Sequence, residues 1–273
     1  MNNHKLLLWI NQSNGDTLGT IPLITQLLSK YPDIEIVFSC FSSQSYLVSH
    51  LPIKVLPIDG NYTNMYLRSQ MSIFTRKFKP YIEDGFTAIH LWLGNYNLVH
   101  TWKNQVITFN NQCKQNNLDI FLDDSDFGYI ELPKNTIEVK NNSIYVENSN
   151  TVSGQTFFHY DVSKYSMMFP NLNFYTTGPV ERQAKNIFDC SKMDLVGLSN
   201  VSRKCNIILG KGSGPFFCTM NEENKSKLKI LSGLREGYRV KFWNDNDENC
   251  HLVDSETEVL NILRMENKKI VKL

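Results

Sequence analysis

Two glycine-rich segments, about two hundred residues apart, carry residue types that suit the binding of a negatively charged ligand. Residues 14–22 (NGDTLGTIP) follow the apolar run 6–10, and residues 210–215 (GKGSGP) follow the apolar run 207–209. Each pattern predicts a strand that ends in a glycine turn, and the first turn opens a helix. Such a turn directs backbone N–H groups and a helix N-terminus toward an anion. One loop in each half of the chain predicts two nucleotide-binding folds that face each other across a cleft.

The composition is that of an ordinary globular protein. The chain has 273 residues, of which 41% are hydrophobic, and a formal net charge of +1. This charge argues against a nucleic-acid partner, and no apolar run reaches the roughly 18 residues that cross a membrane. The six cysteines are scattered without a C-x-x-C pair, which favours reduced thiols and a cytoplasmic protein. We interpret the N-terminus as the first strand rather than a signal peptide, and leave peripheral membrane contact open.

Strands and helices alternate in both halves, which predicts parallel sheets with ligands at the carboxyl ends of the strands. In the first half we expect strands at 5–10, 34–39, 53–56, 86–93 and 120–122, and helices at 18–31, 42–49, 65–81 and 97–115, with Pro22 near the first turn. In the second half we expect strands at 143–147, 173–176, 205–209 and 238–243, and helical segments at 160–169, 180–188, 194–199, 228–231 and 255–265. The polar stretch between them predicts domains at 1–130 and 131–273.

The motifs and their order resemble those of the ADP-heptose:lipopolysaccharide heptosyltransferases, a family with the GT-B fold. Residues 14–22 and 31–36 (YPDIEI) resemble the family's G-D pair, early Pro and Y-P-x-A-x-I segment. Residues 173–181 (NFYTTGPVE) resemble its strand ending in G-G-P-x-E, and residues 194–215 resemble its L-x-E-L…D-x-x-I-G-x-D-S-G-P segment. The resemblance implies a short, divergent member with two Rossmann-like α/β domains, the first binding the acceptor and the second the nucleotide-sugar donor.

Three departures from the family pattern concern the donor more than the fold. Phe216 and Phe217 follow S-G-P, where the family usually has His. Lys211 and Gly212 stand where the family has x-D, and residues 155–161 (QTFFHYD) replace a basic residue before a W-P pair.

By the resemblance, Asp16 is the catalytic base, and Asn14 and Gly15 belong to the same acceptor-side loop. Glycosyl transfer with inversion needs a carboxylate that removes the proton of the acceptor hydroxyl. The alternative role of Asp16 is an N-cap, a position at which Asp is favoured.

The second glycine loop is the expected diphosphate site. Gly212, Ser213 and Gly214 would let phosphate oxygens approach backbone N–H groups, and Lys211 would add a point charge. The alternative is a strand-to-helix turn in which glycine only supplies a positive φ.

Further donor contacts are implied by the resemblance alone. Thr176, Thr177, Gly178 and Glu181 would lie near the donor nucleotide. His159, assigned to the acceptor side or a loop, would replace the missing basic residue. The alternative is an ordinary connection in which Glu181 is favoured in the first turn of a helix.

Other chemistry-bearing side chains have weaker patterns. Asp123, Asp124 and Asp126 lack the remainder of an EF-hand loop, so we interpret them as a solvated linker. The resemblance implies no metal, and no cofactor besides the nucleotide-diphosphate sugar that serves as substrate. His90 and His100 either line an acceptor pocket or pack as ordinary side chains.

These features predict a metal-independent glycosyltransferase that moves a sugar from a nucleotide-diphosphate sugar to a glycan, lipid or protein. Inversion at the anomeric carbon follows from the resemblance. The alternative is a non-catalytic, degenerate GT-B module that binds a nucleotide sugar or a partner protein. A dinucleotide-dependent oxidoreductase is disfavoured because the first loop lacks G-x-G-x-x-G.

Overall fold

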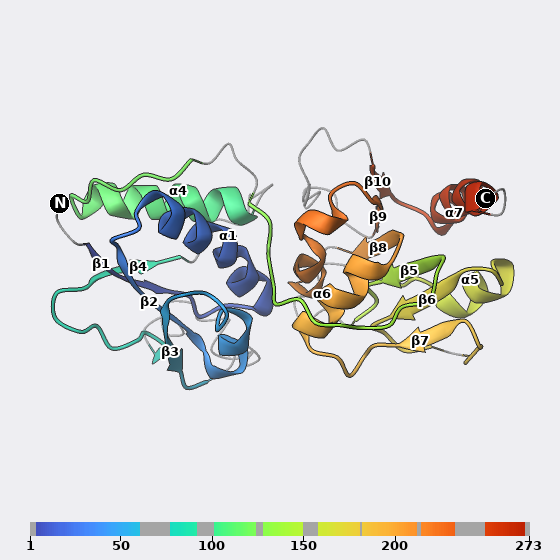
Figure 1. Cartoon of the computed structure of the whole chain (residues 1–273), viewed down its shortest axis with the longest axis horizontal. Coiled ribbons are helices and arrows are strands. Elements are labelled where there is room, and N and C mark those ends of the chain that lie inside the picture. The colour runs from blue at the N-terminus through green and yellow to red at the C-terminus, as the bar shows by residue number, and fades with distance from the viewer. Residues whose placement is uncertain are drawn as a thin grey trace. The chain divides into compact units, whose positions relative to one another are not determined.

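The computed structural model describes residues 4–60, 77–91, 101–123, 128–149, 158–180, 182–211, 214–232 and 249–270. The chain forms two compact units, residues 1–131 and 132–273. Each unit contains one parallel sheet with helices packed on it (Figure 1). None of the described helices is both long and apolar enough to cross a membrane.

The sheet of the N-terminal unit has the strand order β3-β2-β1-β4, and every pairing in it is parallel. The strands are β1 (Lys5–Trp9), β2 (Glu35–Phe41), β3 (Lys54–Ile58) and β4 (Thr87–His90). Residues 6–9 are all buried, as expected for a strand covered on both faces of a parallel sheet. The strand order reverses between β1 and β4, so their carboxyl ends form the ligand-binding edge of such a sheet.

The helices of this unit are α1 (Asn14–Lys30), the 3₁₀ helix η1 (Ser42–Leu47) and α4 (Thr101–Gln115). α1 and α4 lie side by side (Figure 1). The Gln105 side chain of α4 joins them, because its Nε2 donates to the Asp16 carbonyl at 2.9 Å. Gln112 in the same helix holds the end of β4, accepting from the His90 N–H at 3.0 Å and donating to its carbonyl at 2.7 Å.

Three expectations for the first half are wrong. Ser13 is the N-cap of α1, so residues 14–22 are helical rather than a loop, and Pro22 lies well inside the helix instead of near its first turn. Residues 120–122 form no strand. The short helix expected at 42–49 is present as the 3₁₀ helix η1, and the helix expected at 65–81 lies almost wholly outside the described residues.

The sheet of the C-terminal unit has the order β10-β9-β8-β5-β6-β7, again with parallel pairings throughout. The strands are β5 (Ser143–Val146), β6 (Asn173–Thr176), β7 (Ile187–Asp189), β8 (Ile207–Lys211), β9 (Leu228–Ser232) and β10 (Cys250–Val253). Counted from β5, this is the 3-2-1-4-5-6 order of the dinucleotide-binding folds. The topological switch point therefore lies between the adjacent strands β5 and β8.

The helices of this unit are α5 (Val162–Met168), α6 (Leu195–Lys204) and α7 (Glu256–Ile270), with short 3₁₀ helices η2 (Gly214–Thr219) and η3 (Glu222–Asn224). Apolar side chains from α5, α7 and the strands form one buried core. The core includes Ile144, Tyr165, Phe174, Leu209 and Leu263, each fully shielded from solvent.

Two helical segments expected in this half are wrong. Residues 228–231 belong to β9 and pair with β8, and the segment 180–188 contains the start of β7. A short apolar run has no period that separates a buried strand from a buried helix, so the neighbouring strands decide. The strand expected at 238–243 lies outside the described residues.

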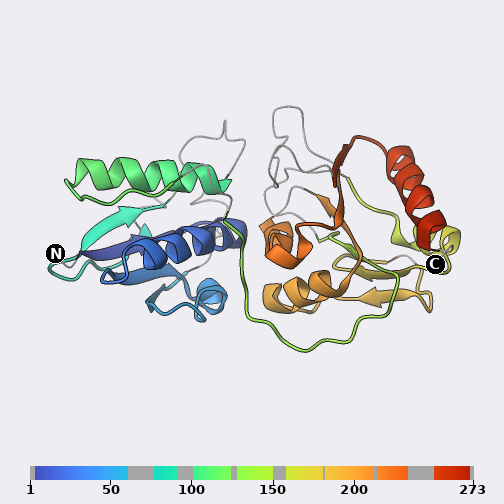
Figure 2. The same ribbon diagram turned by 45° about the horizontal axis from the view of Figure 1, so that its top comes forward.

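An extended segment from residue 132 to 140 belongs to the C-terminal unit (Figure 2). Arg203 Nη1 donates to the Leu132 carbonyl at 3.1 Å, and the N–H of Asn135 donates to Asn200 Oδ1 at 3.0 Å. Both contacts come from α6, so the segment is held along this helix before β5 begins.

Candidate functional site

The switch point of the C-terminal sheet brings two oppositely charged side chains to one edge. Glu147 follows the last residue of β5, and its N–H donates to the Leu209 carbonyl in β8 at 2.8 Å. Lys211 is the last residue of β8. The carboxyl ends of both strands therefore deliver a carboxylate and an ammonium to the crevice where such sheets bind their ligands.

Glu147 is fully buried, and its carboxylate is held by hydroxyl and amide donors. Oε2 accepts from Thr177 Oγ1 at 3.1 Å, and Oε1 accepts from the Ser149 N–H at 3.1 Å and from the Ser149 hydroxyl. A buried carboxylate needs such donors, because leaving it unpaired would cost several kcal/mol.

Lys211 is only 5% exposed, yet its ammonium makes no hydrogen bond to another residue in the described part of the chain. Burial lowers the pKa of Lys211, and the nearby Glu147 carboxylate opposes this shift. A buried cation without an acceptor is costly, so this edge of the sheet is suited to a ligand that carries negatively charged oxygens.

Asn148 locks the loops that surround the charged pair. Its N–H donates to Thr177 Oγ1 at 2.8 Å, its Nδ2 donates to the Tyr160 carbonyl at 2.8 Å, and its Oδ1 accepts from the Tyr160 N–H at 3.0 Å. The same Nδ2 lies 3.2 Å from His159 Nε2. We name Glu147, Asn148, Thr177 and Lys211 the switch-point cluster.

Tyr160 joins the strands beneath the cluster. Its hydroxyl lies 2.5 Å from the Gly210 carbonyl, near the end of β8, and 3.2 Å from the Ile230 carbonyl, in the middle of β9. Tyr160 is fully buried, so the hydroxyl holds the two neighbouring strands at a fixed separation.

The Phe216 ring explains both Gly210 and one departure from the family pattern. A Cβ at position 210 would lie 2.2 Å from this ring, which is itself fully buried. Phe216 thus packs beneath the end of β8, where a histidine side chain would need a buried polar partner.

The structure brings together several of the residues predicted for the donor site. Thr176 ends β6, and Thr177 and Gly178 follow it beside Asn148. His159, which was predicted for the acceptor side or a loop, contacts the same asparagine. Gly214 begins η2, while Glu181, Gly212 and Ser213 lie outside the described residues.

Glu147 and Asn148 were missed by sequence reasoning. Their signal was present, because a polar pair follows directly on the apolar run 144–146, at the carboxyl end of an expected strand.

In the N-terminal unit, Asp16 is the third residue of α1 rather than its N-cap. Its Oδ2 accepts from the Ser13 N–H at 3.1 Å and from the Ser13 hydroxyl at 2.6 Å, which is a capping-box arrangement. Asp16 remains partly exposed, next to the exposed Asn14 and the buried Gly15. The carboxylate is thus oriented by the helix N-terminus and is still accessible.

The ends of β1 and β4 carry a packed aromatic pair near this helix. The Trp9 and His90 rings stack with centroids 3.7 Å apart, and His90 Nε2 lies 3.4 Å from Asn11 Oδ1. Burial lowers the pKa of His90 to about 4, so its imidazole is neutral near pH 7. His90 is partly buried against Trp9, and His100 lies outside the described residues.

The expected acidic linker is described only at its start. Asp123 is exposed, and its carbonyl accepts from Gln26 Nε2 at 3.4 Å, while Asp124 and Asp126 lie outside the described residues.

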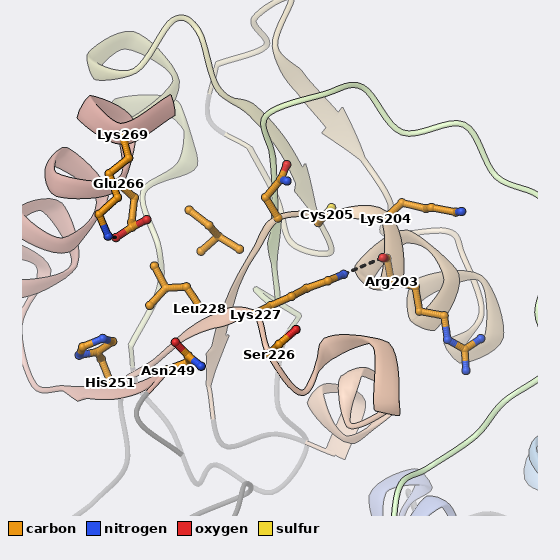
Figure 3. A pocket seen from close by; sticks show the side chains of 12 residues that line it. Arg203, Lys204, Cys205, Ser226, Lys227, Leu228, Asn249, His251, Glu266 and Lys269 are labelled. Carbon is orange, nitrogen blue, oxygen red and sulfur yellow. Dashed lines mark hydrogen bonds and ion pairs between the residues drawn. The ribbon is translucent and has the colours of Figure 1, made fainter. Parts of the chain in front are cut away.

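A cavity of about 600 Å³ lies at the opposite, amino-terminal edge of the C-terminal sheet (Figure 3). Its basic residues complement helix C-termini: Lys227 Nζ donates to the Ser202 and Arg203 carbonyls at 3.0 and 2.6 Å, and Lys269 pairs with Glu266 at 2.6 Å. Lys227 and Lys269 thus already have partners within the protein, and we assign the cavity no ligand.

No protein-family model and no curated protein sequence matches the chain. Solved structures of glycosyltransferases are similar to it, however. A family 9 glycosyltransferase from Veillonella parvula has a TM-score of 0.62 at 11% identity, over 100% of this chain and 97% of that one. The E. coli heptosyltransferase WaaC with ADP has a TM-score of 0.61 at 11% identity, over 96% and 99% of the two chains.

The dodecameric, iron-containing glycosyltransferase TibC of enterotoxigenic E. coli has a TM-score of 0.58 at 11% identity, over 93% of this chain and 63% of that one. At such low sequence identity, the likeness of the structures establishes the fold alone. The predicted GT-B class, with a Rossmann-like parallel sheet in each unit, is therefore confirmed.

Proposed function

We propose that this protein is a glycosyltransferase whose C-terminal unit binds a nucleotide-diphosphate sugar at the switch-point cluster. The observation that carries the proposal is the buried Lys211 ammonium, which lacks a hydrogen-bond acceptor among the described residues. A donor diphosphate supplies acceptor oxygens and negative charge at this position. The glycine-rich residues 212–214 follow Lys211 in the sequence, and we expect their backbone N–H groups to meet the same phosphates.

The solved structures support this choice of ligand. WaaC is described with ADP and with ADP-2-deoxy-2-fluoro heptose, and TibC with ADP-D-β-D-heptose. These proteins have the same fold as this chain, and their ligands all contain a nucleoside diphosphate. We therefore place the donor diphosphate at Lys211, with Thr176, Thr177 and Gly178 toward the nucleotide.

In the proposed reaction, Asp16 takes the proton of the acceptor hydroxyl as this oxygen attacks the anomeric carbon. The bond from that carbon to the diphosphate breaks, and the nucleoside diphosphate leaves with the electron pair, so the configuration inverts. Ser13 orients the carboxylate through its two hydrogen bonds to Oδ2. The acceptor is a glycan, lipid or protein, and the site needs no metal because Lys211 and backbone donors meet the diphosphate charge.

A second candidate is a non-catalytic module that binds a nucleotide sugar. The capping-box role of Asp16 favours it, since a carboxylate retained for helix stability need not act as a base. Donor binding is common to both candidates, and turnover separates them.

Binding of ADP, UDP, GDP and dTDP to the purified protein, measured by calorimetry and thermal stabilisation, tests the donor site. We expect at least one to bind, and Lys211→Met to weaken it at least tenfold, about 1.4 kcal/mol. Lys192→Met, which removes an exposed lysine of the same unit, serves as the matched control. Equal affinity in Lys211→Met and wild type would remove Lys211 from the site. Transfer or hydrolysis of the sugar donor would then identify an enzyme, and binding without turnover a module.

A further inference from the structure

We infer that Glu147 is a positioning residue, which keeps the Lys211 side chain charged and in place for the donor diphosphate. The inference rests on the proposed function and adds a residue that the resemblance does not assign. It assigns Glu147 no contact with the donor itself.

The side chains of Glu147 and Lys211 are both buried. Glu147 is 0% exposed and Lys211 is 5% exposed, and they project from adjacent parallel strands at the switch point. A cation removed from water tends to lose its proton unless an opposite charge lies nearby. The carboxylate at the end of β5 provides this charge to the end of β8.

The Glu147 carboxylate is held in a fixed position. Donors from two different strand ends, Thr177 after β6 and Ser149 after β5, hold its two oxygens. A carboxylate anchored on both oxygens cannot swing toward Lys211 and neutralise it in a tight ion pair. Glu147 can thus favour the ammonium electrostatically while the ammonium stays open to a ligand.

Other titratable side chains also lie around the pair. Tyr145 on β5, Tyr160 before α5 and Cys218 in η2 face Glu147, and burial raises the pKa of all three, so they stay neutral. From β9, the residue paired with Lys211 is the uncharged Ser232.

From α6, the charges of Asp194 and Arg203 act on Cys218. Among the described residues, the charge that acts on Lys211 is therefore that of Glu147.

The consequence is a pH dependence of anion binding. Burial lowers the pKa of Lys211 and Glu147 raises it. Because a diphosphate binds the ammonium form, affinity falls as pH rises through the pKa of Lys211 in the free protein. Replacing Glu147 by a neutral side chain lowers this pKa further, and moves the loss of affinity to lower pH.

The experiment measures inorganic pyrophosphate binding by calorimetry across the neutral to alkaline range. Pyrophosphate tests the diphosphate contact without a choice of nucleoside, and its own titration is common to all variants. We expect Glu147→Gln to lose affinity at a lower pH than wild type does, and to bind about tenfold more weakly where the two curves differ most. Glu147→Asp, which keeps the charge, should follow wild type. In Glu147→Gln/Lys211→Arg the shift should vanish, because Arg stays protonated.

The outcomes separate the diphosphate site at Lys211 from the positioning role of Glu147. If wild type does not bind pyrophosphate, or Lys211→Met binds it equally well, the diphosphate site and this inference both fail. If binding needs Lys211 but Glu147→Gln keeps the wild-type pH profile, only the inference fails. Should Glu147→Gln not fold, Glu147→Met/Thr177→Val removes the charge together with one of the donors that it would leave unpaired, and an unchanged profile there overturns the inference equally.

Discussion

Gly178 lies directly against the backbone of Asn148. A Cβ at position 178 would be 2.3 Å from the Asn148 carbonyl oxygen and 2.8 Å from its carbonyl carbon. The chain after β6 can therefore approach the chain after β5 only because residue 178 has no side chain. This contact sets the separation of Thr177 from Glu147, and so the shape of the switch-point cluster.

We expect Gly178→Ala to push these two strand ends apart. The clash is with backbone, which cannot rotate away, so the free energy of unfolding should fall by roughly 1–3 kcal/mol, and nucleoside diphosphate affinity should fall with it. Urea denaturation and calorimetry measure both. Gly197→Ala in α6 is the control, because its Cβ would lie no closer than 3.3 Å to an Asp194 side-chain oxygen. Equal behaviour of the two variants would contradict the packing argument.

Substitution of Asp16 separates catalysis from helix capping. Asn keeps an oxygen that can accept from Ser13 but cannot take a proton, so Asp16→Asn should fold normally and transfer sugar roughly 10²–10⁴ times more slowly. Asp16→Ala should also lose about 1 kcal/mol of stability, because the capping contact is gone. Initial rates and thermal melting measure the two effects. A fully active Asp16→Asn enzyme would show that Asp16 is not the catalytic base.

Restoring the residue usual in the family after S-G-P should harm this protein. Phe216→His places an imidazole in the fully buried site against Gly210, so we expect a loss of roughly 1–3 kcal/mol of stability. The same change at the neighbouring Phe217, which is only partly buried, should cost less. Chemical denaturation of both variants provides the comparison, and equal losses would mean that the packing on Gly210 is not the cause.

His90 should make the protein less stable in mild acid. Burial lowers its folded-state pKa to about 4 from the usual 6.5, so between these values the unfolded chain binds a proton that the folded chain does not. The free energy of unfolding therefore rises with pH across this window, and acidification from about pH 7 to pH 5 removes on the order of 1–2 kcal/mol.

His90→Phe keeps a ring against Trp9 and removes this titration. Urea denaturation at both pH values should show a smaller acid loss in the variant than in wild type. The lowered pKa of His50 acts in the same direction in both proteins and cancels in the comparison. Identical acid losses would show that His90 is not protonated differently in the folded and unfolded states.

Metal removal tests how the diphosphate charge is met. If Lys211 and backbone donors suffice, sugar transfer should survive EDTA with little change in rate. Loss of activity that Mg²⁺, Mn²⁺ or iron restores would contradict this, and would direct attention to the acidic segment around Asp123. The comparison with iron matters because TibC, which has a similar fold, contains it.

The amino-acid sequence by itself determined the βα rhythm of both halves and most of the strands. Apolar runs such as 6–9 and 207–209 are local signals, and polar residues directly after them mark the carboxyl ends where ligands bind. For this reason Lys211 could be named as a candidate from the residues themselves, whereas Thr177 was implied by the resemblance alone. The resemblance of the ordered motifs to those of heptosyltransferases also predicted the GT-B class.

Only the tertiary structure decided which strand ends are neighbours. Glu147 and Lys211 are far apart in the chain, and they meet because β8 returns to the side of β5 opposite to β6. The same long-range pairing made a strand of residues 228–231, whose short apolar run has no period of its own. Hydrophobic periodicity is a signal over a few neighbouring residues. Strand order and the burial of a charge depend instead on packing between segments that are distant in the sequence. A local pattern therefore cannot show which segments will be neighbours.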